Sequence, residues 1–255
     1  MSHHQSVHLR LIGDVHGYIQ EHYIRSAQCA RYSIQLGDMG FNYVALNQLD
    51  SQRHLFLGGN HDNYTCEETE RPLEEATKLD VVKKRSQYAQ ERVFKFTMLP
   101  EHFMGHFGVW TVPECEGNSD IFFVRGAQSV DRMYRIPGVS WWTDEQLTIS
   151  QFEEAVQLYS EVKPDFVISH ECPYVVHEAF PSFLGAGWGG QGVIRNHTAQ
   201  ALQVMWQCHQ PKLWVFAHYH KPLWEEFQGT TFICLESIDY PESTLDFDDK
   251  LNIIA

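Results

Sequence analysis

The chain has 255 residues, 43% of them hydrophobic, which is enough for a sizeable core in one large domain or two small ones. Its net charge of −14, from 19 Lys and Arg against 33 Asp and Glu, leaves little to build a basic face, so long nucleic acid is disfavoured as a partner. No apolar run approaches the roughly 18–20 residues of a membrane span, and MSHHQSVHLR lacks a hydrophobic signal core, so we expect neither membrane association nor export.

Apolar, β-rich runs alternate with segments of helical spacing along the chain, which predicts an α/β fold. The first predicted strands are VHLRLIG, YSIQLG and RHLFLGG. Helical segments at 18–32 and 42–51 separate these strands. The stretch at 63–92 is charged and interrupted by Pro72, so we expect an insertion that lies over the surface or borders a functional site.

The alternation continues through the rest of the chain. The runs HFGVWTVPE and IFFVRGA precede a predicted helix at 143–162, for which Thr143 is the expected N-cap and Gln146 its partner three residues on. Two further strands, DFVIS and KLWVFA, are followed by a terminal hairpin of LWEEFQ and TFICLE. No repeat or low-complexity linker divides the chain, so we expect a single domain over residues 1–255 with an acidic tail at about 240–255.

The cysteines are widely separated and form no CxxC pair. They are Cys29, Cys66, Cys115, Cys172, Cys208 and Cys234. Such spacing indicates reduced thiols and not a disulfide framework, which predicts a cytoplasmic protein.

Five short polar clusters come directly after five of the predicted strands. They contain Asp14 and His16 in GDVHG, Asp38 in GDMG, Asn60 and His61 in GNHD, His170 in SHECP, and His218 and His220 in AHYH. Open α/β sheets bind ligands at the carboxyl ends of their strands. We therefore expect the clusters to meet in space, although the first and last lie about two hundred residues apart in the chain.

Carboxylate, amide oxygen and imidazole together bind divalent transition metals, and no cysteine pair is present to favour a structural zinc site. One metal would not need so many ligands. Two metals that share a bridging carboxylate would, and such pairs, about 3.5–4 Å apart, are known to clamp the attacking and leaving oxygens in phosphoryl transfer. Glycines suit strands that turn sharply while presenting a ligand. Those nearby are Gly13, Gly37, Gly58 and Gly59.

The order D-x-H, G-D, G-N-H-[DE], a lone His and G-H-x-H resembles the signature of the calcineurin-like metallophosphoesterase superfamily, and the resemblance spans residues 9 to 222. It implies two mixed β-sheets packed face to face as a sandwich flanked by helices. It also implies two divalent metal ions. Asp14, His16 and His220 would hold the first, Asn60, His170 and His218 the second, and Asp38 would bridge them.

The resemblance further implies a reaction, in which a metal-bridging hydroxide attacks phosphorus in line with the leaving group. His61 would be the catalytic residue, close to the phosphoryl group without binding metal. Asp62 would orient His61 or cap the following turn. Two departures from the family pattern are Ala217, in place of the usual Gly of G-H-x-H, and Phe41, where many members have an Asp that supports the bridging ligand.

Substrate contacts are expected in the segment VRGAQSVDRMYRIPGVSWWTDEQL, because arginine forks suit phosphate and aromatic rings stack on bases. The candidates are Arg125, Arg132 and Arg135, with Tyr134, Trp141 and Trp142 among them. The alternative is that the tryptophans pack under the following helix and the arginines pair with acids. The glycine-rich stretch at 185–192 is a second candidate for anion binding.

Three functions are compatible with these residues. The first is a hydrolase of small phosphomonoesters or phosphodiesters, possibly nucleotides. The second, a Ser/Thr phosphoprotein phosphatase, fits less well, because that branch typically has G-D-x-V-D-R-G and G-N-H-E where this chain has GDMGFNY and GNHD. The third is a scaffold of the same fold without catalysis, which usually has ligands replaced. The ligand types accept Mn, Fe, Zn, Ni or Co, with manganese favoured, and the sequence leaves the oligomeric state open.

Overall fold

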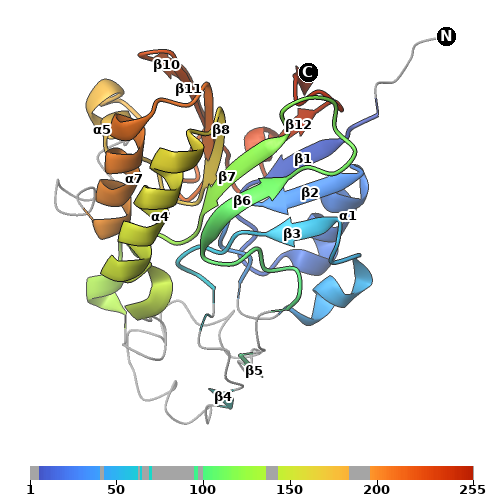
Figure 1. Ribbon diagram of the computed structural model, residues 1–255. Helices are drawn as coiled ribbons and strands as arrows, with labels where there is room; N and C mark the ends of the chain where they lie inside the picture. The colour runs from blue at the N-terminus through green and yellow to red at the C-terminus, as the bar shows by residue number, and fades with distance from the viewer. Residues whose placement is uncertain are drawn as a thin grey trace.

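The computed structural model describes residues 6–40, 43–62, 64, 69–70, 95–96, 100–135, 143–183 and 196–254. Two mixed β-sheets form its centre, and helices lie outside them (Figure 1). The predicted α/β sandwich is therefore confirmed. Most of the expected insertion at 63–92, the stretch at 185–192, and Phe41, Trp141 and Trp142 lie outside the described residues.

The first sheet has five strands in the order β13-β12-β1-β2-β3. Its strands are β1 (Leu9–Ile12), β2 (Tyr32–Gln35), β3 (His54–Phe56), β12 (Thr244–Phe247) and β13 (Ile253–Ile254). β1, β2 and β3 are parallel, so the segments that follow them leave the sheet at the same edge. β12 runs antiparallel to β1, with Leu9 opposite Phe247.

The second sheet has six strands in the order β10-β11-β9-β8-β7-β6. Its strands are β6 (Phe107–Thr111), β7 (Asp120–Val124), β8 (Phe166–Ser169), β9 (Leu213–Phe216), β10 (Leu223–Phe227) and β11 (Thr230–Cys234). β7, β8, β9 and β11 are parallel, while β10 and β11 form the predicted antiparallel hairpin. A separate short pair joins β4 (Thr69–Glu70) and β5 (Lys95–Phe96).

The helices among the described residues differ in length, two of them having five residues and the other two 14 and 12. They are α1 (Ile24–Gln28), which continues a π-helical segment at Ile19–Tyr23, α4 (Ile149–Val162), α5 (Val175–Ala179) and α7 (His197–Cys208), with 3-10 turns at Val44–Gln48, Arg132–Tyr134, Thr143–Glu145 and Pro241–Ser243. α4 and α7 lie side by side against the outer face of the six-stranded sheet (Figure 1).

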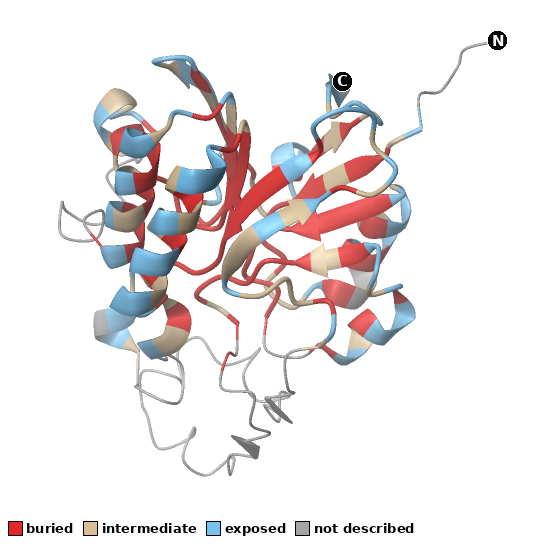
Figure 2. Ribbon diagram, viewed as in Figure 1, coloured by how far each residue is buried: buried red, intermediate tan, exposed pale blue. Residues whose placement is uncertain are grey.

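Successive side chains of a strand face opposite sides of the sheet, and this divides the core into layers. In β7, Ile121 and Phe123 face the other sheet, whereas Phe122 and Val124 pack against the helices. A third cluster, which includes Ile12, packs the outer face of the five-stranded sheet against α1. The strands at the centre of both sheets are accordingly buried along most of their length (Figure 2), whereas β6 and β10, at the edges of the six-stranded sheet, are half-buried or exposed.

Two sequence expectations need correction. The helix expected at 143–162 begins at Ile149, and its N-cap is Thr148, whose side chain accepts from Gln151 N while Gln151 caps in return. Thr143 instead begins a 3-10 turn. Part of the segment expected as an acidic tail is β12, because Leu245 and Phe247 alternate inward between acidic neighbours.

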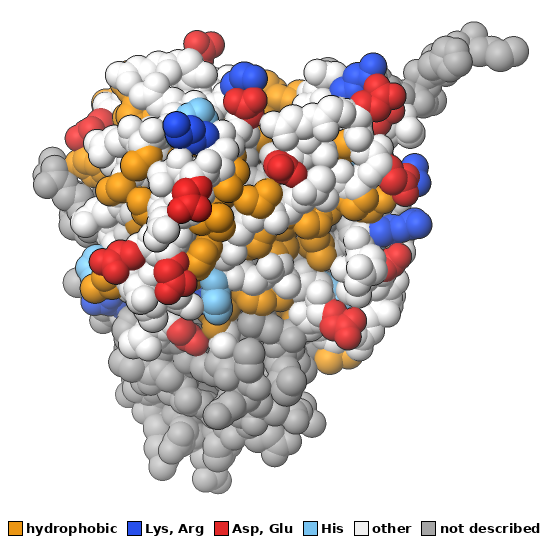
Figure 3. Space-filling model, in the orientation of Figure 1, with side chains coloured by type: hydrophobic (Ala, Val, Ile, Leu, Met, Phe, Trp, Pro, Cys, Tyr) orange, Lys and Arg blue, Asp and Glu red, His pale blue; other side chains and the backbone are white. Residues whose placement is uncertain are grey.

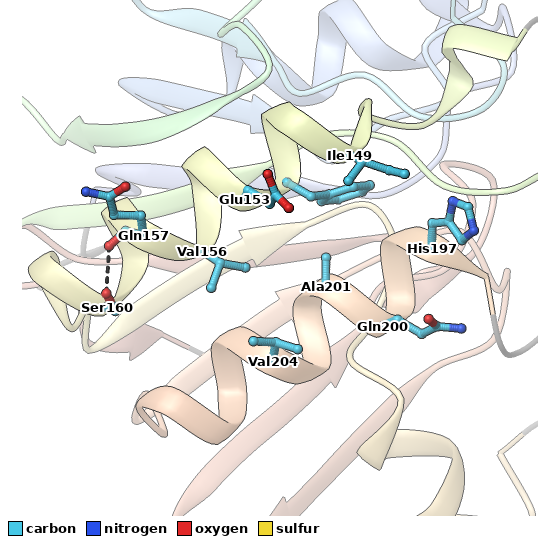
Figure 4. Close-up of a pocket in the computed structure, with 10 residues that line it drawn as sticks. Ile149, Glu153, Val156, Gln157, Ser160, His197, Gln200, Ala201 and Val204 are labelled. Carbon is cyan, nitrogen blue, oxygen red and sulfur yellow. Dashed lines mark hydrogen bonds between the residues drawn. The ribbon is translucent and has the colours of Figure 1, made fainter.

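On the outer surface, acidic side chains are scattered over the face shown in Figure 3, in keeping with the net charge of −14. An open groove lies between α4 and α7, where Ile149, Val156, Ala201 and Val204 line it (Figure 4). The lining includes none of the predicted site residues. Among the described residues, no helix has the length and apolar character needed to cross a bilayer.

Candidate metal centre

The predicted ligands meet where the two sheets present the carboxyl ends of their parallel strands. Asp14 and His16 follow β1, Asp38 follows β2, and Asn60 and His61 follow β3 of the five-stranded sheet. The six-stranded sheet supplies the remaining three after β8 and β9. These are His170, His218 and His220. The convergence expected from the sequence is therefore present.

Four of these residues have a left-handed backbone. The φ angles of His16, Asp38, His218 and His220 are 49°, 58°, 71° and 49°. This conformation costs about 1–2 kcal/mol for a residue with a Cβ. Such strain persists where the surrounding structure holds it, and it is commonest at functional sites.

The first group of donor atoms contains Asp14, His16, Asp38 and His220. Nε2 of His220 lies 2.6 Å from Oδ2 of Asp14 and 2.8 Å from Nε2 of His16. Nε2 of His16 is 3.6 Å from the same Asp14 oxygen and 3.9 Å from Oδ2 of Asp38. Two imidazole nitrogens and two carboxylate oxygens thus surround one point, and this is the set that the resemblance assigned to the first metal.

The second group lies on the other side of Asp38. Nε2 of His170 is 3.3 Å from Oδ1 of Asp38 and 3.2 Å from Oδ1 of Asn60. His218 belongs to the same cluster, with its ring centroid 4.9 Å from that of His170. One oxygen of Asp38 therefore faces each group, which is the arrangement a bridging carboxylate requires.

The ring of His170 is oriented for ligation. Its Nδ1 lies 2.8 Å from the carbonyl oxygen of Leu36, so this nitrogen carries the proton and donates it. Nε2, the ring nitrogen left for a metal, then faces the side-chain oxygens of Asp38 and Asn60. A backbone carbonyl that fixes the tautomer in this way is the usual support of a metal-binding histidine.

Two further buried residues, which the sequence did not reveal as functional, orient Asn60. Its Nδ2 donates to Oγ of Ser129 at 3.2 Å, and that hydroxyl donates to Oε2 of Glu145 at 2.6 Å. The backbone N–H of Ser129 also donates to Glu145, at 3.0 Å. Because the amide nitrogen is held by Ser129, the Asn60 oxygen faces the ligand cluster.

Asp62 supports the loops and does not reach His61. It accepts from the backbone of Gly59 at 2.7 Å and of Gly40 at 3.2 Å, and from the hydroxyl of Tyr43 at 3.0 Å. These bonds tie the loop after β2 to the loop after β3. The loop after β3 also holds Asp38, since Oδ1 of Asp38 accepts from the backbone N–H of His61 at 2.7 Å.

The electrostatics of the centre favour positive charge. Burial alone would raise the pKa of Asp14 and Asp38, but the adjacent imidazoles hold both pKa values below the ordinary range. Burial alone would lower the pKa of His170, yet the carboxylates of Asp38 and Asp14 raise it to about 9. Burial and the neighbouring His170 lower the pKa of His218 to about 3, which leaves the neutral ring that a metal ligand needs.

His61 lies beside the two groups without belonging to either. Its Nε2 is 3.9 Å from Oδ2 of Asp38 and 2.9 Å from Nη2 of Arg135. Nε of Arg135 is in turn 2.5 Å from Oδ1 of Asp131. Burial lowers the pKa of His61 to about 4, and the charge of Arg135 acts in the same direction while Asp38 opposes it.

The three arginines expected near the substrate occupy different places. Arg135 reaches His61, whereas Arg132 is exposed on the neighbouring turn. Arg125 is buried, and its guanidinium lies 3.7 Å above the ring of Tyr64. Its nitrogens donate to His106 and to the carbonyl of Asp144, both at 2.7 Å, and these contacts hold neighbouring parts of the fold together.

The residues of the centre fit two divalent cations. Asp14 is fully buried, and within the described part of the chain its Oδ2 forms no hydrogen bond of normal geometry, although Nε2 of His220 is 2.6 Å away. A buried anionic oxygen among imidazole nitrogens is typical of a metal ligand, and the donor set is the nitrogen and oxygen mix that divalent transition metals accept.

The sequence profile of the calcineurin-like phosphoesterases matches residues 9–222. No curated protein matches the chain. Among solved structures, phosphopantetheinyl hydrolase (PptH) from Mycobacterium tuberculosis is similar over 95% of this chain and 96% of its own, with 13% identity and a TM-score of 0.49. A dimetal phosphatase from Danio rerio is similar over 96% and 93%, with 11% identity and a TM-score of 0.46. These values carry no argument about substrate.

Proposed function

Because the chain belongs to the calcineurin-like phosphoesterase family, we propose that it is a dinuclear metal-dependent enzyme that hydrolyses small phosphomonoesters or phosphodiesters, nucleotides among them. The observation that supports this most directly is the position of Asp38. Its Oδ2 faces the cluster of Asp14, His16 and His220, while its Oδ1 faces His170 and Asn60. Two cations held by these residues would supply Lewis-acid chemistry for the attack of water on phosphorus.

The open side of the centre is where a substrate has access. Asp14 and His170 are fully buried, whereas the side chain of His220 is 42% exposed and that of His16 is 28% exposed. His61 and Arg135 border this side, with 26% and 15% of their side chains exposed. A phosphoryl group bound at the exposed ligands would therefore have both residues close by.

Arg135 and His61 have complementary tasks in this proposal. The guanidinium of Arg135, fixed by Asp131, presents N–H groups to a non-bridging phosphoryl oxygen, for which its planar fork is suited. His61 lies between this guanidinium and Asp38, and its task in the proposal is to hydrogen-bond the phosphoryl group or to protonate the leaving oxygen. The pKa of about 4, which burial gives this ring, favours the hydrogen bond. The backbone bond from His61 to Asp38 holds the residue next to the bridging ligand.

Small substrates are favoured over long nucleic acid by the charge of −14, which leaves few cations to follow a phosphate backbone. Two expectations from the sequence complete the proposal, namely manganese as the favoured metal and the cytoplasm as the location. The second is supported by the free thiols of all the described cysteines, which are Cys29, Cys115, Cys172, Cys208 and Cys234.

The proposal is tested with a substrate panel. The purified chain is loaded in turn with Mn, Fe, Zn, Ni and Co, and assayed on nitrophenyl phosphate, bis-nitrophenyl phosphate, mononucleotides, cyclic nucleotides and a phosphopeptide. Turnover of a small ester with two bound metals supports the proposal. Turnover of the phosphopeptide alone would assign the chain to the protein phosphatases, and metal binding without turnover of any ester would indicate a scaffold.

Arg135→Ala, compared with Arg132→Ala, identifies the phosphate contact among the arginines. We expect Arg135→Ala to raise KM and lower kcat about tenfold or more, because a charge-assisted contact is lost, while Arg132→Ala has the smaller effect. Equal effects of the two substitutions would remove Arg135 from its proposed role.

A further inference from the structure

A buried polar network lies behind the ligand loops. Tyr219 stands between the ligands His218 and His220 in the sequence, but its side chain packs in the helix-side core with Phe183 and Phe216. Its hydroxyl lies 2.9 Å from Nε2 of His177, 3.5 Å from Sγ of Cys172, and in contact with Oε1 of Glu171. The residue between two histidine ligands is thus held by polar contacts on the far side of the loop.

Glu171 extends this network to other parts of the structure. It follows the ligand His170 directly and is only 1% exposed. Its Oε2 accepts from Nδ2 of Asn196 at 2.8 Å, and Oδ1 of Asn196 caps α7 by accepting from the backbone of Ala199 at 2.8 Å. One carboxylate therefore connects the His170 loop, the loop of Tyr219 and the first turn of α7.

The backbone around Tyr219 explains why such support is needed. His218 and His220, on either side of it, have φ of 71° and 49°, in the left-handed region. Residues with a Cβ remain there only when the surrounding structure holds them. The ring and hydroxyl of Tyr219 are held firmly enough to supply that constraint, since the side chain is 4% exposed.

We propose that Tyr219 and Glu171 are a positioning pair that sets the geometry of the two histidines in the AHYH loop. The inference rests on the proposed metal centre but not on the reaction. By the resemblance, His220 serves one metal and His218 the other, so loss of the Tyr219 hydroxyl affects both positions. Neither Tyr219 nor Glu171 touches the substrate or the reacting atoms in this scheme.

A third metal site is the alternative explanation of this network, because donor atoms of Glu171, Cys172 and His177 lie within 4.8 Å of one another. The hydroxyl of Tyr219 lies among them and makes the contacts that an ion would make. Nδ1 of His177 is buried and has no hydrogen-bond partner among the described residues, whereas metal-binding histidines almost always donate their second ring N–H. The network is therefore a hydrogen-bond centre.

The test is Tyr219→Phe, which keeps the ring and removes the hydroxyl. We expect the affinity for at least one of two Mn ions, measured by competition with a chelating indicator, to fall about 10–100-fold. When both proteins are loaded with Co in place of Mn, the visible absorption of Tyr219→Phe should also differ from that of the wild type, because the geometry of the histidine ligands changes. Tyr159→Phe is the matched control, since Tyr159 is fully buried in the same core and donates its hydroxyl to the carbonyl of His209 at 2.8 Å.

Unchanged Mn affinity in Tyr219→Phe, or an equal loss in Tyr159→Phe, would overturn the proposal. Glu171→Ala should weaken Mn binding to a similar degree, and the double variant should lose less than the two single losses combined, because the residues act as one unit. Fully additive losses would contradict this. A third metal equivalent that Cys172→Ser removes would show that these donors hold an ion, and it too would refute the pair.

Turnover is scored separately from affinity. If the wild-type enzyme is active and Tyr219→Phe binds Mn with normal affinity, the positioning pair is refuted and the proposed function is not. A wild-type chain that binds two metals and hydrolyses no ester in the panel refutes the proposed function alone.

Discussion

Gly59 lies against the side chains of Asp38 and His170, and Gly59→Ala should disrupt the metal centre. A Cβ at this position would lie 2.5 Å from Nε2 of His170 and 2.6 Å from the backbone nitrogen of Asp38, and closer still to Oδ1 of Asp38. An ordinary contact begins at 3.4 Å, so the His170 ring must retreat by about 0.9 Å. Metal–ligand distances tolerate only about ±0.2 Å, so the affinity for the metal at His170 should fall at least about 100-fold.

The same substitution should also lower the stability of the apoprotein. Overpacking a filled site costs about 1–3 kcal/mol, and for a chain of this size each kcal/mol lowers Tm by about 2–4 °C. Metal content is measured by elemental analysis after dialysis against excess Mn, and Tm by thermal unfolding with a chelator present. These two readouts separate loss of the ligand geometry from loss of the fold.

Gly229→Ala is the control for backbone strain. Gly229 has a φ of +83°, and an added Cβ there meets nothing within 4 Å. The variant should lose about 1–2 kcal/mol of stability and keep its metals. If Gly59→Ala retained two Mn ions with wild-type affinity, the packing argument for the centre would be refuted.

Three other substitutions test separate parts of the site. Asp38→Asn should remove most of both metals, because the bridging position needs an anionic donor; two tightly bound ions in this variant would contradict the bridge. His61→Gln should keep the metals and lower turnover by roughly 10²–10⁴, with a smaller loss on nitrophenyl esters if His61 acts as a general acid, and full activity would exclude a direct role. Arg125→Lys should lower the unfolding free energy by about 1–3 kcal/mol with KM unchanged, and a tenfold rise in KM at unchanged stability would indicate that Arg125 is a substrate contact.

The strands and the convergence of the ligands could be predicted because both depend on local sequence. Runs such as DFVIS and KLWVFA have the β-rich, apolar character of buried parallel strands, and the polar cluster follows each of them immediately. The expectation of a domain spanning the whole chain stays a prediction. β12 was not predicted, because the strand is only four residues long and Asp246 separates its two buried apolar positions, Leu245 and Phe247.

Long-range contacts explain the remaining differences. The sequence shows three arginines in one segment but not that Arg125 folds over Tyr64 while Arg135 reaches His61, 74 residues away. In the same way, nothing local links Glu145 to Asn60 through Ser129. Only Tyr219 had a local signal, since it is placed between two predicted ligands.

Both sheets contribute to each donor group, so a bound ion would tie one sheet to the other and lengthen the lifetime of the folded protein in a cell. Asp14 and His16 follow a strand of one sheet, while His220, which faces the same point, follows a strand of the other. An ion held there would cross-link chain segments about two hundred residues apart. The unfolded chain has no such preformed site, so it would bind the ion far more weakly. Binding then adds directly to the free energy of unfolding, by about 4 kcal/mol at a thousandfold excess over Kd. Metal supply would thereby govern proteolytic turnover of the chain as well as its catalysis.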